Sequence, residues 1–396
     1  VKPVSIVINW GQYNERRNSE KMRVVVAIDS FKGSMSSLEA GESIKQGILK
    51  AKKDAKVEIR PLADGGEGTV EALSIGMGGK LINVEVTGPV GKKVNAVYGI
   101  VESTKTAIIE MSQAAGITLV SGDEKNPLHT TTFGVGEMIK DAVKRGCRHF
   151  IVGIGGSATN DCGVGMLQAL GYEFFDIDGK QVGYGAEGVR DIVKIEDKNV
   201  LKELSQCTFR VACDVTNPLC GELGCSAVFG PQKGATKEMV EDMDAWLYSF
   251  SNLVKEKYKD ADSTYPGCGA AGGLGYAFHN FTNSKMESGI QIVLDETRLE
   301  DYVKDADIVV TGEGRLDSQT VMGKAPVGVA NIAKKYNKKV IAFSGSVTED
   351  AGVCNEHGID AFFPILRRIV TLEEAMQTDT ARKNLTDTAE QVFRLL

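Results

Sequence analysis

The chain has 396 residues, of which 42% are hydrophobic and 25% charged, a composition typical of a globular protein and not of a disordered or fibrous one. Its formal net charge is −7 and its basic runs are short, so no nucleic-acid partner is expected. No apolar run reaches the roughly 18 residues of a membrane span, so no membrane partner is expected either.

The eight cysteines are scattered without any C-x-x-C pair, which indicates reduced thiols and a cytoplasmic location. Cys220 and Cys225 are spaced wrongly for zinc and lack a nearby histidine, so packing is favoured for them over metal binding. The length predicts two domains. Residues 1–21 lack the apolar segment of a signal peptide and are expected to form an N-terminal tail.

From Met22 onward the chain alternates between apolar runs, polar glycine turns and helical spacing, which is typical of an α/β fold. Val24–Ile28 is a short β-branched run, as expected of a buried parallel strand. Ser36-Ser37-Leu38-Glu39 has the form of a capping box and predicts the start of a helix. A second strand is expected at Val57–Arg60.

The next three strands are predicted at Ile82–Val86, Val94–Ile100 and Thr106–Glu110. They are close together and joined by short turns, which favours an antiparallel ribbon. Thr130–Thr132 are expected to cap a helix that leads to a strand at His149–Ile154.

The simple alternation of strand and helix returns near the C-terminus. The remaining predicted elements are strands at Phe209–Asp214, Asp307–Thr311, Lys339–Ser344 and Ala361–Ile365, with a helix near Val327–Tyr336. We therefore expect residues 22–88 and 290–396 to form one parallel-sheet domain. Residues 89–289 would form an inserted mixed α/β domain, with an active site in the cleft between the two.

Asp29-Ser30-Phe31-Lys32-Gly33-Ser34 follows the first predicted strand and precedes a helix. A carboxylate, hydroxyls, a lysine and a flexible backbone at a helix start suit a phosphate group. An ordinary turn with serine caps and a solvated lysine explains the segment equally well.

Ala63-Asp64-Gly65-Gly66-Glu67-Gly68-Thr69 places two carboxylates around a glycine pair, ahead of a helix expected near Thr69. A purely structural turn rarely needs both acids and three glycines. The carboxylates are suited to a hydroxyl group or to Mg²⁺.

Gly153-Ile154-Gly155-Gly156-Ser157-Ala158-Thr159-Asn160-Asp161 matches G-x-G-x-x-A, a weak form of the dinucleotide fingerprint. Glu173 and Asp176 lie near the distance at which a ribose-binding acid is sought, so a nicotinamide oxidoreductase is a competing class. The hydroxyl, amide and carboxylate groups after the glycines suit phosphate and hydroxyl contacts better.

Ala212-Cys213-Asp214-Val215-Thr216-Asn217-Pro218 ends a strand with an acid that can hold metal or substrate, or merely cap a turn. Gly230-Pro231-Gln232-Lys233-Gly234-Ala235 offers a lysine to an anion, or is a surface loop. Thr311-Gly312-Glu313-Gly314-Arg315-Leu316-Asp317-Ser318 contains an arginine that can bind a carboxylate or phosphate, or pair with Glu313 or Asp317. A P-loop is excluded there, because the required glycine and final Ser/Thr are absent.

Taken together, these six segments resemble the bacterial glycerate kinase family in order and spacing over nearly all of the chain from Met22 onward. The resemblance implies a Rossmann or flavodoxin-like domain with an inserted second domain. It also implies ATP-dependent phosphorylation of D-glycerate with Mg²⁺, most often to 2-phosphoglycerate. A 3-phosphoglycerate product and, in another class, a nicotinamide-dependent oxidoreductase of a small hydroxy acid remain alternatives. A homo-oligomer is a candidate assembly, and the oligomeric state is left open.

The resemblance and the chemistry of the segments together define the expected site. The expected catalytic residues are Asp64, Lys32, Asp214 and Arg315, with Asp214 also the candidate Mg²⁺ ligand. The expected residues that bind glycerate or ATP are Asp29, Ser30, Gly33, Gly65, Gly66, Glu67, Gly155, Gly156, Ser157, Thr159, Asn160, Asp161, Lys233, Glu313 and Asp317. Lys32, Lys233 and Arg315 are expected to contact anionic oxygens directly.

Overall fold

The structure is a computed structural model that describes residues 21–66 and 68–396, and it divides into two compact units. The first unit consists of the described residues up to Arg60 together with Arg298–Leu396, and the second is Pro61–Thr297. All but the last residue of the expected tail, and Glu67 of the expected site, lie outside the described residues.

The first unit contains a five-stranded sheet in which every neighbouring pair is parallel. Its order is β13-β12-β11-β1-β2. The strands are β1 (Arg23–Val26), β2 (Lys56–Ile59), β11 (Ile308–Leu316), β12 (Lys339–Val347) and β13 (Ala361–Pro364). Renumbered within this unit, the order is 2-1-3-4-5, which is the flavodoxin-like arrangement.

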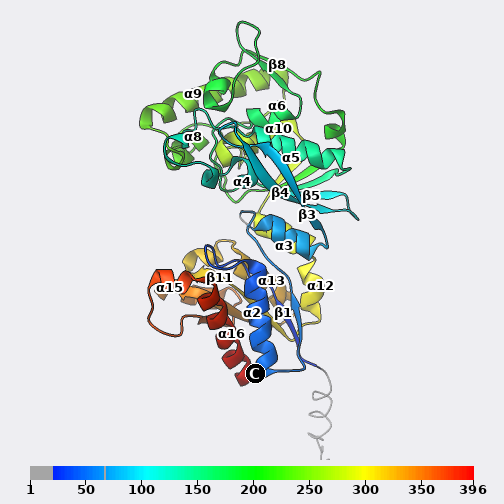
Figure 1. The fold of residues 1–396 in the computed structure, drawn as a ribbon, viewed down its shortest axis with the longest axis vertical. Helices are drawn as coiled ribbons and strands as arrows, with labels where there is room; N and C mark the ends of the chain where they lie inside the picture. The colour runs from blue at the N-terminus through cyan, green and yellow to red at the C-terminus, as the bar shows by residue number, and fades with distance from the viewer. Residues whose placement is uncertain (1–20, 67) are drawn as a thin grey trace, which may run out of the picture. The chain divides into compact units, whose positions relative to one another are not determined.

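Helices cover both faces of this sheet, as a buried parallel sheet requires. Figure 1 shows α2 (Ser37–Ala51) beside α16 (Thr378–Leu395), and their apolar residues share one core with alternate residues of β1, β11 and β12. The intervening strand residues, such as Val25 and Val309, are also buried, and α13 (Ala325–Lys335) packs on β11 and β12. The other helices of the unit are α12 (Leu299–Lys304), α14 (Val353–Glu356) and α15 (Leu372–Met376).

The second unit contains a six-stranded mixed sheet with the order β10-β9-β6-β5-β4-β3. Its strands are β3 (Lys80–Thr87), β4 (Lys93–Val101), β5 (Thr106–Glu110), β6 (His149–Gly153), β9 (Thr208–Ala212) and β10 (Ser284–Glu287). The pairs β3–β4 and β4–β5 are antiparallel, which confirms the predicted ribbon, and β5, β6, β9 and β10 run parallel. An α/β fold with one parallel and one mixed sheet is therefore confirmed.

One face of the mixed sheet carries a large apolar core built with α5 (Phe133–Lys144), α6 (Val164–Ala169), α9 (Lys237–Lys257) and α10 (Leu274–Phe281). The opposite face is covered by α3 (Thr69–Gly76) and α11 (Gly289–Glu296). Glu110 at the end of β5 accepts a hydrogen bond from the Val70 N–H of α3 at 2.8 Å. Smaller elements are β7 (Glu173–Phe175), β8 (Lys194–Glu196), α4 (Ser112–Ala115), α7 (Gly185–Arg190) and α8 (Cys225–Phe229).

The division between the units differs from the expected boundaries at residues 88 and 290. Residues 61–88 belong to the second unit because β3 pairs with β4 along its whole length and α3 packs against β4 and β5. Helix α11 packs on β9 and stays with the same unit. The turn signals in the sequence do not reveal this boundary, because the strand that pairs with β3 lies further along the chain.

The two predicted helix caps have different outcomes. Ser36 caps α2 with a complete capping box, as predicted. Thr132 occupies the N-cap position of α5 but makes no capping hydrogen bond to the helix. Its hydroxyl instead donates to the Asp161 carboxylate at 2.8 Å, since a buried carboxylate competes for the same side chain.

Candidate active site

The first unit brings two predicted segments together at the carboxyl edge of its sheet. In a 2-1-3-4-5 sheet, ligands bind where the strand order reverses, which here is between β1 and β11. The turn after β1 lies directly on the end of β11: the Asp29 N–H donates to the Gly312 carbonyl at 3.0 Å. A Cβ atom on Gly314 would lie 3.5 Å from the Cα atom of Phe31, so the turn and the strand end are in close contact.

Several charged groups gather on the β11 end of this edge. Arg315 Nε lies 3.3 Å from a carboxylate oxygen of Asp317, so the arginine forms the ion pair that the sequence left as an alternative. Its side chain is nevertheless 64% exposed and can also reach a ligand. Lys324 lies 3.6 Å from both Glu313 and Asp317.

Lys324 was not among the predicted site residues, although it stands beside the glycine at 323 and at the N-cap of α13. Its position in the strand–turn–helix pattern is the signal that could have found it. Glu313 and Asp317 also have structural contacts. Thr320 donates to Glu313 at 2.7 Å, and Asp317 accepts from the Gln319 N–H at 3.0 Å. Burial raises the pKa of Glu313, against the opposing effects of Thr320 and Lys324.

Four residues of the turn after β1 complete this edge. Asp29 is buried and accepts from the Ser30 N–H at 2.7 Å, whereas Lys32 and Gly33 are exposed. The backbone of Gly33 has a positive φ of 76°, which glycine adopts without strain.

The second unit gathers its predicted residues at the carboxyl edge of its parallel strands. The last residues of β5, β6, β9 and β10 stand in register: Glu110, Gly153, Ala212 and Glu287. The turn that contains Gly65 lies against this edge. A Cβ atom on Gly153 would be 2.3 Å from the Gly65 carbonyl oxygen, and one on Gly65 would be 2.6 Å from the Cβ atom of Ala212. Because positions 65 and 153 are both glycine, the Gly65 turn can pack closely against the ends of β6 and β9.

Asp64 and Asp214, predicted from segments far apart in the sequence, belong to one cluster. Asp64 accepts from the Gly66 N–H at 3.0 Å, and Asp214 accepts from the Gly289 N–H at 3.1 Å. Asp214 is exposed on one side, but the protein around its carboxylate removes much of its water. This desolvation raises the pKa of Asp214, the contacts with Gly289 and Ser288 oppose it, and the nearby charge of Asp64 adds to the rise.

The loop after β6 presents its glycines outward. Gly155 and Gly156 are exposed and Ser157 is half-buried, whereas Thr159 is fully buried. Lys233, which was expected to contact anionic oxygens directly, is only 1% exposed. Its ammonium group donates to the Ser157 hydroxyl at 2.8 Å and to the Thr159 carbonyl at 2.6 Å, so it lies behind the loop. Burial lowers the pKa of Lys233 to about 8.

Asn160 and Asp161 are also buried, and their contacts hold the loop in place. Asn160 donates to the Ser226 hydroxyl at 2.9 Å. Asp161 accepts from the Thr132 N–H at 2.7 Å and from the N–H groups of Gly163 and Gly165, while burial raises its pKa. Asp161 therefore has structural partners for both carboxylate oxygens, whereas the buried Oδ1 atom of Asn160 has no hydrogen-bond partner among the described residues.

The competing dinucleotide hypothesis fits the structure poorly. Its acid should stand at the end of a strand beside β6, but Glu173 lies in β7, which pairs with β8 in a separate two-stranded sheet. Asp176 accepts from the N–H groups of Asp178 and Lys180 within an exposed turn.

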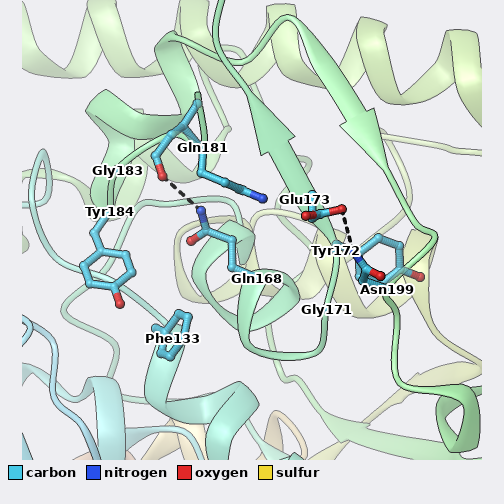
Figure 2. A pocket seen from close by; sticks show the side chains of 10 residues that line it. Phe133, Gln168, Gly171, Tyr172, Glu173, Gln181, Gly183, Tyr184 and Asn199 are labelled. Atoms are coloured by element: carbon cyan, nitrogen blue, oxygen red, sulfur yellow. Dashed lines mark hydrogen bonds between the residues drawn. The ribbon is translucent and has the colours of Figure 1, made fainter. Parts of the chain in front are cut away.

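A cavity of about 540 Å³ in the second unit is lined by none of the residues expected to bind glycerate or ATP, although Glu173 of the dinucleotide alternative does line it (Figure 2). Its lining includes Gln168, which donates to the Val182 carbonyl at 3.1 Å, and Glu173, which accepts from Asn199 at 2.9 Å. Among the described residues that line it, none is basic. It therefore lacks the cations that an anionic substrate requires, and the strand-end clusters are the better candidates.

Within residues 21–66 and 68–396, no group of three or more His, Cys, Asp or Glu side chains is arranged to hold a metal ion. The eight cysteines are free thiols. No helix in the described part of the chain has the length and apolar character needed to span a membrane.

Comparison with known proteins identifies the family of the chain. The sequence profile of the Glycerate kinase family matches residues 24–396. The chain is 48% identical to a glycerate kinase of Haemophilus influenzae over 375 residues, covering 95% of this chain and 99% of the relative. It is 46% identical to a glycerate 2-kinase of Escherichia coli over 356 residues, covering 90% and 93%.

A crystal structure of a protein designated glycerate kinase 2, from Salmonella typhimurium, superposes with a TM-score of 0.87 at 46% identity. The match covers 94% of this chain and 98% of that one. The resemblance seen in the six sequence segments is thus confirmed over the length of both chains. The chain belongs to the glycerate kinase family.

Proposed function

We propose that this protein transfers the γ-phosphoryl group of ATP to the 2-hydroxyl of D-glycerate, forming 2-phosphoglycerate and ADP. The observation that carries the proposal is the convergence of Asp64 and Asp214 with the glycine loop Gly155–Ser157 at one edge of a sheet. The names of the similar proteins, glycerate kinase and glycerate 2-kinase, support the substrate and the position phosphorylated.

The reaction needs a positioned hydroxyl, neutralised phosphate charge and an acceptor for one proton. The substrate oxygen forms a bond to the γ-phosphorus as the bond to the ADP oxygen breaks, and the hydroxyl proton leaves. Asp64 is the group to which we assign that proton, because it is half-buried and its Oδ1 atom is already oriented by the Gly66 N–H.

Asp214 fits a Mg²⁺ ligand. Mg²⁺ is usually bound by one or two carboxylates together with substrate phosphates, and an exposed carboxylate beside a second one satisfies that requirement. Bound there, the ion would neutralise charge on the transferred group. Asp214 is already held by the Gly289 N–H, so it would bind the ion with little rearrangement.

In the first unit, Lys32 and Arg315 are the groups to which we assign anionic oxygens. Both side chains are exposed at the switch point of a flavodoxin-like sheet, which is where such sheets bind phosphate-bearing ligands. Asp29, Ser30 and Gly33 would shape that turn, and Lys324 adds a third cation.

Phosphorus NMR of the product tests the function and the position together. The protein is incubated with ATP, Mg²⁺ and D-glycerate, and we expect ADP to form only when glycerate is present, with the new signal that of 2-phosphoglycerate. A 3-phosphoglycerate signal would overturn the assignment of the hydroxyl alone. Glycerate-independent ADP formation, or reduction of a nicotinamide cofactor by glycerate, would overturn the kinase proposal. A cytoplasmic location and the oligomeric state stay predictions to be tested separately.

A further inference from the structure

Within the part of the chain that the structure describes, Lys233 is a buried cation without a carboxylate partner. It is the last residue of η4 (Pro231–Lys233), a short 3₁₀ turn, and is 1% exposed. Among the described residues, no carboxylate oxygen lies within 4 Å of its ammonium nitrogen; both hydrogen-bond acceptors, the Ser157 hydroxyl and the Thr159 carbonyl, are neutral. Burying a charge without an opposite charge is costly, so such a residue calls for an explanation.

Two titratable groups act on this lysine, and neither offsets its burial. Cys225 at the start of α8 and Asp161 in the loop after β6 both favour the charged ammonium, but burial outweighs them and lowers the pKa of Lys233 to about 8. At neutral pH the group is still mainly protonated. A positive charge is thus held just behind the loop that presents Gly155 and Gly156 to solvent.

The lysine determines what Ser157 can do. An ammonium group can only donate, so the Ser157 oxygen accepts from Lys233 and keeps its own hydrogen for another acceptor. In the described part of the chain no acceptor for that hydrogen lies within hydrogen-bond distance. The N–H groups of Gly155 and Gly156 likewise have no acceptor among the described residues.

The backbone around this turn is anchored on its other side. Gly156 has a positive φ of 73°, and its carbonyl accepts from the Ile117 N–H at 2.8 Å. The Ala158 N–H donates to the Ala115 carbonyl at 2.9 Å. The exposed donors are therefore held in one place, as in a backbone nest that binds anions.

We propose that the turn Gly155–Ser157 is an oxyanion subsite and that Lys233 supplies its positive charge from behind, through Ser157, without touching the ligand. The oxyanion is the carboxylate of glycerate or a phosphate group of ATP, both of which offer the same acceptor chemistry. Lys233 is thus a positioning residue. The inference rests on the proposed function, since both ligands come from that reaction.

The test compares Lys233→Met with Lys237→Met. Methionine keeps the length of the side chain and removes the charge, and Lys237 is the matched control, because its side chain is 93% exposed at the start of α9. Charge-assisted hydrogen bonds contribute about 1.5 to 3 kcal/mol, so we expect the Lys233 variant to raise the KM for one substrate roughly 10- to 100-fold. The KM for the other substrate should change less than about twofold, and the control should match the wild type.

A rise in the KM for glycerate assigns the subsite to the carboxylate, and a rise in that for ATP assigns it to a phosphate group. Equal changes in both constants, or a loss of kcat alone, would overturn the inference in favour of a structural role. Ser157→Ala should reproduce the same selective rise, and an unchanged KM in a folded Ser157→Ala protein would also refute it. This second variant decides the matter if Lys233→Met does not fold.

The pH profile gives an independent readout. In the wild type and in Lys237→Met, kcat/KM for the bound substrate should fall as the pH rises through about 8, because the ammonium loses its charge. Lys233→Met should not show this fall in kcat/KM at alkaline pH, and persistence of the fall in this variant would contradict the proposal. Failure of the proposed function is distinguishable, since the wild type would then show no glycerate-dependent ADP formation at any pH.

Discussion

Replacing Asp64 by asparagine separates its chemical role from its structural one. The Gly66 N–H donates to the Oδ1 atom of Asp64 at 3.0 Å. The Oδ1 atom of asparagine can accept the same hydrogen bond, so the turn should keep its shape. What is lost is the negative charge and the ability to take a proton. A positioned general base contributes about 10² to 10⁴ in rate, which corresponds to roughly 3 to 5.5 kcal/mol of barrier. We expect kcat to fall by that factor.

Stability and ATP affinity should change little in the Asp64→Asn protein. The substitution removes a like charge near Asp214, so it relieves repulsion, and the Gly66 N–H keeps its Oδ1 acceptor. The change in the free energy of unfolding should stay within about 1 kcal/mol.

Asp176→Asn is the matched control for this experiment. Asp176 accepts from the Asp178 N–H at the same 3.0 Å, with the same spacing of two residues, but it lies in an exposed turn after β7. The assays are the steady-state rate of ADP release, nucleotide binding by calorimetry and thermal unfolding. Near-normal turnover of Asp64→Asn would refute the reasoning and direct the search to Asp214 and Asp317. Unfolding of the variant would show instead that the turn is structural.

Three further predictions concern the second unit. Gly153→Ala should displace the Asp64 turn, because the new Cβ atom would lie 2.3 Å from the Gly65 carbonyl oxygen. We expect kcat to drop and the free energy of unfolding to fall by about 1 to 3 kcal/mol. An unchanged kcat in a stable protein would contradict this. Asp214→Asn should raise the Mg²⁺ concentration for half-maximal rate roughly tenfold or more, measured by Mg²⁺ titration, and an unaltered titration would remove Asp214 from the metal site. Lys233→Met should be more stable than the wild type at pH 7. Between pH 8 and 10.5 the unfolded wild type binds more protons than the folded wild type, so the stability of the wild type rises with pH. The stability advantage of the variant, measured by urea unfolding, should therefore shrink by roughly 3 kcal/mol over this range. A constant difference in stability would contradict the lowered pKa of Lys233.

Local sequence patterns were sufficient for the elements whose signals lie within a few residues. The β-branched run at Val24–Ile28 predicted β1, the short turns between three closely spaced segments predicted the antiparallel ribbon, and Ser36 with Glu39 predicted the start of α2. The glycine and acid segments at strand ends were likewise visible, because parallel strands place their following turns at one edge. The helix α9 went unpredicted, although Met243, Leu247, Phe250 and Val254 recur at helical spacing and are buried.

The three-dimensional fold alone decided which of these segments meet and what their side chains can reach. Strand order brought Asp64 to the same edge as Asp214, and the pairing of β3 with β4 moved the domain boundary to Arg60. It also buried Lys233 behind Ser157, where the sequence alone suggested an exposed contact with substrate. The physical reason is that burial and pairing depend on residues distant in the chain, whereas propensities and turn signals depend only on neighbours.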